Sequence, residues 1–399
     1  MNKLTIDEVS LQNKRVLMRV DFNVPLDGGK VTDDTRIRAA LPSIHKVLKS
    51  GGKLILMSHL GRPKGQRAEK YSLKPAAEQL SQLLGKSVTL APDCVGTETE
   101  DLVGKMQNGD VVVLENLRFH AEEEANDAEF ARKLAALADV YINDAFGAAH
   151  RAHASTEGVT HIISQSAAGY LMEKELRSLG TLLADPARPF IAIIGGAKIS
   201  GKIDVIRNLL PRVDAILVGG GMVYTFLRSK GVETGKSLVE EDKMSVAQAV
   251  YDFLGSVQNR NNAELVLPDD HVVAASIDAA AGKNVEEIPA DLLGVDIGPK
   301  AIAHYQDLIA SARTIFWNGP MGVFENGAFA KGTMSVAAAV AKATDNGGFS
   351  VVGGGDSVSA LMKSGLSGHI SHISTGGGAS LEFMSGKALP GVEALTPAS

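Results

Sequence analysis

The sequence is poor in the residues and segments that mark several common classes of protein. Its 399 residues include one tryptophan and one cysteine, Cys94. A single cysteine excludes an internal disulfide framework and cysteine-based zinc sites, and it fits a reducing compartment. No apolar run approaches the roughly 20 residues that a bilayer-spanning helix needs. The opening residues, MNKLTIDEVS, lack the basic and apolar regions of a secretory signal.

Long tracts of one charge are also missing. The chain has 40 lysines and arginines against 46 aspartates and glutamates, a formal net charge of −6. Mild acidity without a basic tract argues against nucleic acid as the main partner. We therefore expect a cytoplasmic protein that binds neither nucleic acid nor membranes. Separately, we expect it to be a monomer.

Glycine, in contrast, is plentiful and unevenly spread. The chain has 42 glycines, of which 14 fall in residues 1–185 and 28 in residues 186–399. Arginine and histidine are instead more frequent in residues 1–185, which contain 10 of the 16 arginines and 6 of the 10 histidines. One half therefore supplies fixed cations, and the other supplies bare backbone.

Short apolar segments alternate with amphipathic stretches of helical length along the whole chain. This alternation is typical of parallel sheets whose two faces are covered by helices. Because 399 residues exceed the usual size of one core, we expect two doubly wound, Rossmann-like α/β domains. The expected strands lie at 15–20, 53–57, 110–114, 139–142, 190–194, 215–218, 264–267, 314–317 and 349–352.

A helix joining the two domains is expected near the middle of the chain. Residues 170–183 have apolar side chains at helical spacing, and Pro186 and Pro189 follow them. The predicted domains are 1–168 and 187–379, with the joining helix in 169–186. An ordinary surface helix within one domain is the alternative.

Cationic and hydrogen-bonding residues follow the expected strands of the first half. Ligands of parallel sheets bind outside the carboxyl ends of the strands, and arginine grips phosphate or carboxylate with two hydrogen bonds. We therefore expect Arg36, Arg62, Arg118 and Arg151 to converge on a small, multiply anionic ligand. Surface ion pairs are the alternative reading of each arginine. A metal site built from the histidines is less favoured, because they lack paired ligand spacing on one element.

Glycine-rich loops follow the strands of the second half, as backbone that approaches phosphate closely requires. The segment 196–202 nearly fits a P-loop, but Ile203 stands where Ser or Thr should hold magnesium, and no triplet completes GxGxxG. Asp356 is therefore the candidate magnesium ligand. Lys198 and Lys202 would share one helix face and reach a transferring group. Neither GxSxG nor a base beside Cys94 is present, so we expect direct transfer between two bound ligands.

An ordered set of nine motifs between Arg15 and about Val392 resembles the phosphoglycerate kinase family. The motifs are RVDFNVP, SHLGRP, ENLRFH, NDAFGAAHRAHAS, GGAKISGKI, VGGGM, WNGPMGVFE, GGGDS and STGGGASLE. Two departures are Met321, where the family usually has proline, and Ser200-Gly201, where Ser/Ala-Asp is common.

The resemblance implies reversible phosphoryl transfer between 1,3-bisphosphoglycerate and MgADP, giving 3-phosphoglycerate and MgATP, in glycolysis and gluconeogenesis. It also implies two lobes that close about a hinge, with residues from about 380 to 399 packing back on the first lobe.

The resemblance also implies a role for each matched residue. Arg36 and Lys198 would stabilise the moving phosphoryl group, Lys202 would bind nucleotide phosphate, Glu325 the ribose and Asp356 magnesium. The implied triose ligands are Asp21, Asn23, Arg36, His59, Arg62, Arg118 and Arg151. Other implied nucleotide ligands are Gly195, Gly219, Gly220, Asn318, Gly354, Gly355 and Ser357, and Gly377 is implied as a catalytic residue that presents an N–H donor.

Two other functions are compatible with parts of the sequence. A two-domain NAD-dependent dehydrogenase would explain the α/β pattern, but the incomplete GxGxxG motifs argue against it. A non-catalytic, two-lobed anion-binding or nucleotide-sensing protein would explain the loops, but not the retention of Lys198, Arg36 and Asp356.

Overall fold

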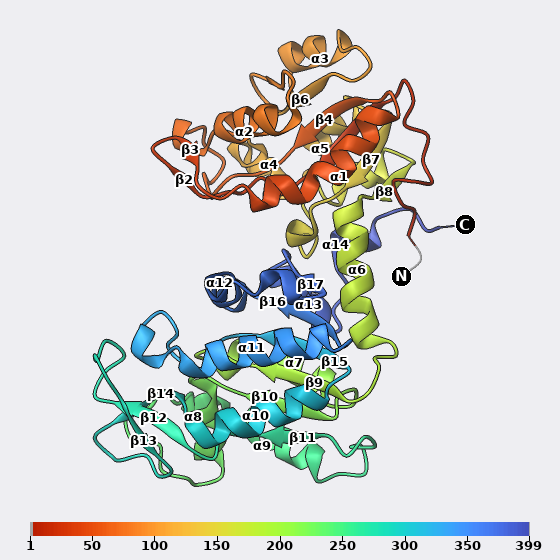
Figure 1. The fold of residues 1–399 in the computed structure, drawn as a ribbon. Coiled ribbons are helices and arrows are strands. Elements are labelled where there is room, and N and C mark those ends of the chain that lie inside the picture. Colours follow the sequence, from red (N-terminus) through yellow and green to blue (C-terminus); the bar gives the residue numbers. More distant parts are fainter. Residues whose placement is uncertain (1–2, 399) are drawn as a thin grey trace. The chain divides into compact units, whose positions relative to one another are not determined.

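The computed structural model describes residues 3–398, which form two compact units (Figure 1). The first unit comprises the chain up to Arg177 together with the residues from Ala388 onward, and the second is Ser178–Lys387. Helix α6 (Tyr170–Leu183) has the bounds of the helix predicted from the apolar spacing, and it crosses the division at Arg177.

The first unit is built on a six-stranded sheet in the order β5-β6-β4-β1-β7-β8. Every neighbouring pair is parallel; β4, β6 and β5 lie on one side of β1, and β7 and β8 lie on the other, as in a doubly wound sheet. The strands are β1 (Arg15–Arg19), β4 (Lys53–Met57), β5 (Thr89–Leu90), β6 (Val111–Val113), β7 (Val140–Asn143) and β8 (Ser166–Ala168).

Helices and a small hairpin complete the first unit (Figure 1). The core packs Val16, Met18, Leu54 and Leu56 of the sheet with apolar residues of α1 and α2, such as Ile44. The two ends of the described chain lie side by side, because Lys3 pairs with Pro397. The elements are β2 (Leu26–Asp27), β3 (Lys30–Val31), α1 (Thr35–Lys49), α2 (Lys74–Leu84), α3 (Thr97–Gly104), α4 (Ala121–Glu124), α5 (Ala128–Ala135) and α14 (Pro390–Glu393).

The second unit repeats the architecture, with a sheet in the order β11-β10-β9-β15-β16-β17. All its neighbouring strands are parallel. Strands β9 and β15 are buried at every position, which agrees with a sheet covered on both faces. The strands are β9 (Phe190–Ile194), β10 (Ala215–Val218), β11 (Glu264–Val266), β15 (Thr314–Asn318), β16 (Phe349–Gly353) and β17 (His372–Ile373).

Helices α10 and α11 pack on this sheet through Tyr305, Ile309 and Val340, against Ile193 and Trp317. A second, antiparallel sheet in the order β13-β12-β14 lies at one side of the unit (Figure 1). The further elements are α7 (Ile203–Leu209), α8 (Met222–Ser229), α9 (Met244–Leu254), β12 (His271–Ala274), β13 (Lys283–Val285), β14 (Leu293–Ile297), α10 (Pro299–Ser311), α11 (Lys331–Asp345), α12 (Gly355–Ser364) and α13 (Gly378–Met384).

The prediction of two parallel α/β sheets is confirmed. The antiparallel sheet was not predicted, because β12–β14 mix polar and apolar residues and β13 is largely exposed. The C-terminal crossing to the first unit falls between Lys387 and Ala388 rather than near residue 380. Within the described part of the chain, no helix has the length and apolar character that spanning a bilayer requires.

Candidate active site

The carboxyl ends of the first unit's central strands carry a buried polar network that begins at Arg19, the last residue of β1. This side chain is 1% exposed. Its Nε donates to Ser155 Oγ (2.9 Å), and Ser155 Oγ donates to Glu123 Oε1 (2.6 Å). Glu123 is fully buried, and it also accepts from the backbone N–H of Ser155 (3.0 Å). The network therefore gives each buried charge a hydrogen-bonding partner.

The same arginine fixes the protonation of His59, which follows β4. Arg19 Nη2 lies 3.0 Å from His59 Nδ1. Because the guanidinium can only donate, Nδ1 accepts and the ring proton is on Nε2. Burial, with Arg19, Arg118 and Arg36 nearby, lowers the pKa of His59 well below its usual value. His59 is therefore a neutral donor through Nε2.

His153 is the second neutral histidine of this network. Burial and the neighbouring Arg19 and Arg118 lower its pKa to about 4. Its Nδ1 lies 3.9 Å from Glu123 Oε1.

Arg36, in the first turn of α1, is held at the end of β1 by two acceptors. Its Nη1 lies 3.1 Å from Asp21 Oδ2 and donates to the carbonyl of Asn23 (3.0 Å). Asn23 Oδ1 in turn accepts from the N–H of Gly61 (2.9 Å), in the loop after β4. Asp21 and Asn23 thus lie beside Arg36 and also orient it.

The other three predicted arginines differ in how firmly they are held. Arg118 Nη1 donates to the carbonyl of Gly61 (2.9 Å), and its Nε lies 3.4 Å from Glu124 Oε1. Arg62 is exposed, without a hydrogen bond or ion pair to any residue in 3–398. Arg151 is exposed, and its Nε lies 3.2 Å from His150 Nε2. Arg62 and Arg151 are therefore open to a ligand, whereas Arg118 is positioned in advance.

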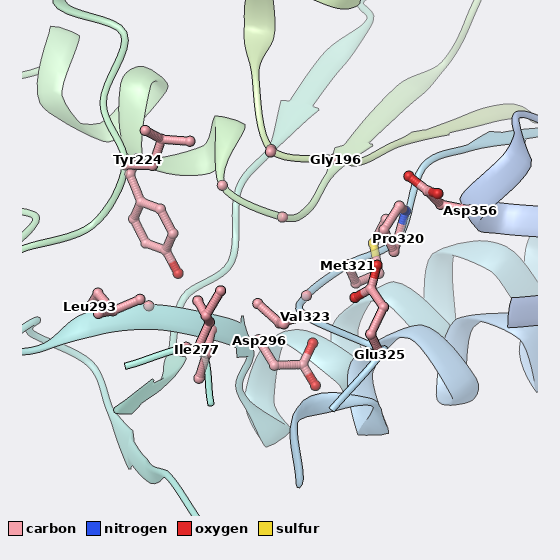
Figure 2. Close-up of a pocket in the computed structure, with 17 residues that line it drawn as sticks. Gly196, Tyr224, Ile277, Leu293, Asp296, Pro320, Met321, Val323, Glu325 and Asp356 are labelled. Carbon is pink, nitrogen blue, oxygen red and sulfur yellow. The ribbon is translucent and has the colours of Figure 1, made fainter. Parts of the chain in front are cut away.

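In the second unit, a cavity of about 340 Å³ opens beside the ends of β9, β10 and β15. Its volume lies within the range of about 300 to 1,000 Å³ that is typical of small-molecule sites. Tyr224 and Leu293 lie toward one end of it, and Glu325 and Asp356 lie toward the other (Figure 2). Its apolar walls include Leu238, Ile277, Leu293, Val295, Pro320, Met321 and Val323.

A smaller cavity of about 230 Å³ has the properties of a phosphate cradle. Lys202 Nζ donates to Asn318 Oδ1 at its wall. The Asn318 amide nitrogen is buried, and no acceptor in the described chain bonds it. Gly354, at φ 90°, precedes the first turn of α12, whose N-terminus carries partial positive charge. The cradle therefore presents unsatisfied donors and one cation, as an anion requires.

The two predicted lysines are in different environments. Lys202 lines the cradle, and burial lowers its pKa to about 8. Lys198 is exposed, and it makes no hydrogen bond or ion pair to residues 3–398. The short helix Ile199–Gly201 separates them, and within it the Ser200 hydroxyl donates to Glu240 Oε1 (2.6 Å).

Close backbone packing explains three of the predicted glycines. A Cβ on Gly195 would lie 2.1 Å from the carbonyl oxygen of Pro320, and one on Gly219 would lie 2.5 Å from Met321 Sδ. Gly220 has a φ of +72°, and a Cβ there would lie 2.5 Å from the Gly196 carbonyl oxygen. Of these three, only Gly220 lines the larger cavity, so Gly195 and Gly219 act by holding its floor together.

The remaining predicted residues lie at or near the cradle. Asp356 lines both cavities. Ser357 Oγ accepts from the N–H of Gly319 (2.5 Å), so it holds the loop after β15. Gly355 and Gly377 line the smaller cavity, and Gly377 has a φ of +53° before α13.

The donor set at Asp356 fits magnesium. Its carboxylate is exposed and has no ion pair to any residue of the described chain. Magnesium favours one or two carboxylates together with phosphate oxygens and water, and the neighbouring cradle is where phosphate would lie.

Sequence reasoning missed part of each site. In the first unit it passed over Arg19, Glu123 and Ser155, although a charged residue inside an apolar strand is itself a signal of a buried partner. In the second unit it missed the cavity walls, such as Tyr224 and Leu293, because apolar walls have the same pattern as core.

The fold is that of a two-domain α/β protein, with an arginine-rich polar site at the strand ends of the first unit and two adjoining cavities at those of the second. This is the class to which phosphoryl-transferring kinases belong. The family model described as "Phosphoglycerate kinase" matches residues 6–387. The chain belongs to the phosphoglycerate kinase family and is a phosphotransferase, so the dehydrogenase and non-catalytic alternatives are dropped.

Relatives of the whole chain agree with this assignment. The chain is 56% identical to the phosphoglycerate kinase of Chloroherpeton thalassium, over all of both chains. It is 57% identical to that of Chlorobaculum tepidum, covering 99% of this chain and 100% of the relative. The solved phosphoglycerate kinase of Coxiella burnetii has a TM-score of 0.88 at 39% identity, with 98% of each chain covered. The structure from Pyrococcus horikoshii has a TM-score of 0.83 at 33% identity over the same shares.

Proposed function

We propose that this protein transfers a phosphoryl group reversibly between 1,3-bisphosphoglycerate and MgADP, giving 3-phosphoglycerate and MgATP in glycolysis and gluconeogenesis. In the forward direction the P–O bond to the carboxyl oxygen breaks and a P–O bond to the terminal phosphate of ADP forms. The observation that carries the proposal is the pair of adjoining cavities in the second unit, one apolar and one built for phosphate, with Asp356 on both.

In this proposal the first unit holds the triose. Both triose substrates are anionic at each end and carry a hydroxyl group in the middle, which suits arginines beside neutral hydrogen-bonding groups. His59 donates through Nε2, and Arg118 is already oriented by the Gly61 carbonyl. The complete set is Asp21, Asn23, Arg36, His59, Arg62, Arg118 and Arg151.

The second unit holds the nucleotide. The base lies in the apolar cavity, Glu325 takes the ribose, and Lys202 and Asn318 take phosphate oxygens. The backbone N–H groups at Gly354, Gly355, Ser357 and Gly377 donate to phosphate oxygens as well, while Gly195, Gly219 and Gly220 keep the floor of the site compact. Asp356 would hold magnesium, which would supply positive charge to neutralise the phosphates.

The transferring group is stabilised by Arg36 and Lys198. A phosphoryl group in flight is loosely bonded and spreads negative charge over its oxygens, so positioning and charge stabilisation dominate catalysis. These cations act most strongly when water is excluded. We therefore propose that the protein works by hinge closure, as a cytoplasmic monomer.

A coupled assay for ATP-dependent acyl-phosphate formation from 3-phosphoglycerate tests the reaction. Absence of activity with Mg²⁺ present would contradict it. Lys198→Ala should lower kcat by about 10² to 10³, by analogy with loss of one oxyanion donor, with little change in nucleotide affinity. Arg62→Ala should mainly raise KM for 3-phosphoglycerate. Arg38→Ala, at an exposed arginine paired with Asp34, is the matched control and should change neither kcat nor KM. A raised KM in Lys198→Ala together with a lowered kcat in Arg62→Ala would show that the two roles are exchanged.

A further inference from the structure

A cluster of three different metal-ligating groups lies in the first unit, apart from the residues assigned above. Asp93 and Cys94 are in the loop between β5 and α3, and His120 lies between Phe119 and α4. One carboxylate oxygen, the thiol sulfur and one imidazole nitrogen all lie within 4.8 Å of one another. Cys94 is fully buried, whereas the side chains of His120 and Asp93 are 27% and 36% exposed. The cluster thus has a buried thiol and an open side.

The oxygen–nitrogen separation is close to that of a tetrahedral metal site, and the sulfur lies within 4.8 Å of both atoms. Bonds of about 2.0 to 2.3 Å imply separations of about 3.3 Å between the oxygen and nitrogen ligands and about 3.6 Å from sulfur to nitrogen. The structure has 2.8 Å between Asp93 Oδ1 and His120 Nε2, in a direct hydrogen bond. Admitting an ion therefore requires that pair to widen by about 0.5 Å, which side-chain rotation can supply.

The surrounding contacts hold the three groups in place. The Cys94 N–H donates to Asp93 Oδ1 (2.7 Å), and Thr99 Oγ1 donates to the Asp93 carbonyl (3.0 Å). The His120 ring packs against Phe130, with ring centroids 5.2 Å apart. Such outer contacts orient metal ligands and raise the affinity of a site.

We propose that Asp93, Cys94 and His120 form a binding site for one thiophilic divalent cation of the Zn²⁺ type, distinct from the magnesium that accompanies the nucleotide. The thiol releases its proton to solvent, and lone pairs of the thiolate, the carboxylate and the neutral imidazole form three bonds to the ion. Water takes the fourth position, on the open side. From the sequence, the single cysteine excluded cysteine-based zinc sites. That exclusion was too broad, because a site with three protein ligands needs only one thiolate.

The test is titration of the full, untagged chain with Co²⁺ as a spectroscopic substitute for Zn²⁺, without nucleotide or Mg²⁺. We expect one equivalent to produce a thiolate-to-cobalt charge-transfer band, which Zn²⁺ then abolishes. Cys94→Ser should remove the band, and His120→Gln should weaken binding by at least about tenfold. The matched control is His369→Gln, because His369 lies 3.0 Å from an aspartate, Asp345, at another exposed place; it should change neither the band nor the affinity.

Three results would overturn the proposal. These are the lack of a band in the wild-type protein, a band that persists in Cys94→Ser, and unchanged affinity in His120→Gln. If circular dichroism shows that Cys94→Ser does not fold, Asp93→Asn replaces it. That variant keeps the thiol, so it should retain the band but require at least about tenfold more Co²⁺; wild-type affinity in it would count against the site.

Discussion

Lys202 provides a test of the phosphate cradle that does not depend on turnover. Burial lowers the pKa of its ammonium group to about 8, so the free protein has an appreciable fraction of neutral lysine near that pH. Bound phosphates would favour the charged form and raise this pKa again. Nucleotide binding should therefore take up protons from the buffer.

The size of the uptake follows from the neutral fraction before binding. With a pKa of about 8, this fraction is about 0.1 at pH 7, about 0.5 at pH 8 and about 0.9 at pH 9. Nucleotide phosphates are fully ionised across the upper part of this range, since their last pKa values lie near 6. Uptake should thus approach one proton as the pH rises, and affinity should fall as protonation becomes costly.

Calorimetry of MgADP binding measures this directly, when each pH is repeated in two buffers of different ionisation enthalpy. The difference in observed heat gives the number of protons taken up. Lys202→Met should remove the uptake, whereas Lys342→Met, at an exposed lysine of α11, should retain it. Equal uptake at pH 7 and pH 9 in the wild-type protein, or uptake that survives Lys202→Met, would refute the assignment of Lys202 to the phosphates.

Three further variants test the packing and buried charges around the sites. Gly195→Ala should destabilise the protein by about 1 to 3 kcal/mol in urea unfolding, because the new Cβ meets the Pro320 carbonyl, whereas Gly201→Ala, with open space around it, should not. Glu123→Gln should cost about 3 kcal/mol by leaving buried Arg19 uncompensated, and exposed Glu122→Gln is its control; equal melting temperatures would contradict this. Burial raises the pKa of Asp296 to about 7, so between pH 4 and 7 the folded state holds more protons than the unfolded state and wild-type stability should fall as pH rises. When the free energy of unfolding is compared at pH 4 and pH 8, Asp296→Asn should remove up to about 4 kcal/mol of the loss seen in the wild-type protein. Asp307→Asn, at an exposed site, should leave that loss unchanged.

Strand positions were predictable because buried parallel strands leave a local signal. The segments 53–57, 190–194 and 215–218 were predicted with the bounds that the structure shows. Strands β12–β14 escaped prediction because polar residues such as His271 and Asp296 interrupt β12 and β14 and because β13 is largely exposed, so the apolar run that marks a central strand is absent. Local patterns therefore identify the two parallel sheets but not the antiparallel one beside the larger cavity.

The site residues likewise divide into those with a local signal in the sequence and those whose role depends on the fold. Arg62 could be named from the sequence because cations recur after the predicted strands of the first half, and Lys198 because it lies in a glycine-rich loop after a predicted strand. Leu293 and Ile277, in contrast, follow the same apolar pattern as core residues although they line a cavity. Arg19 lies between these cases. A charge inside an otherwise buried strand needs a buried partner, so the sequence implied that Arg19 has such a partner. Glu123 is 104 residues away, however, and only the fold could identify it as that partner.

The same reasoning applies to His120 and Asp93, whose pairing with Cys94 depends on two loops that no local pattern connects. Interactions between distant loops are thus where the structure adds most to the sequence, and the proposed cation site is of that kind.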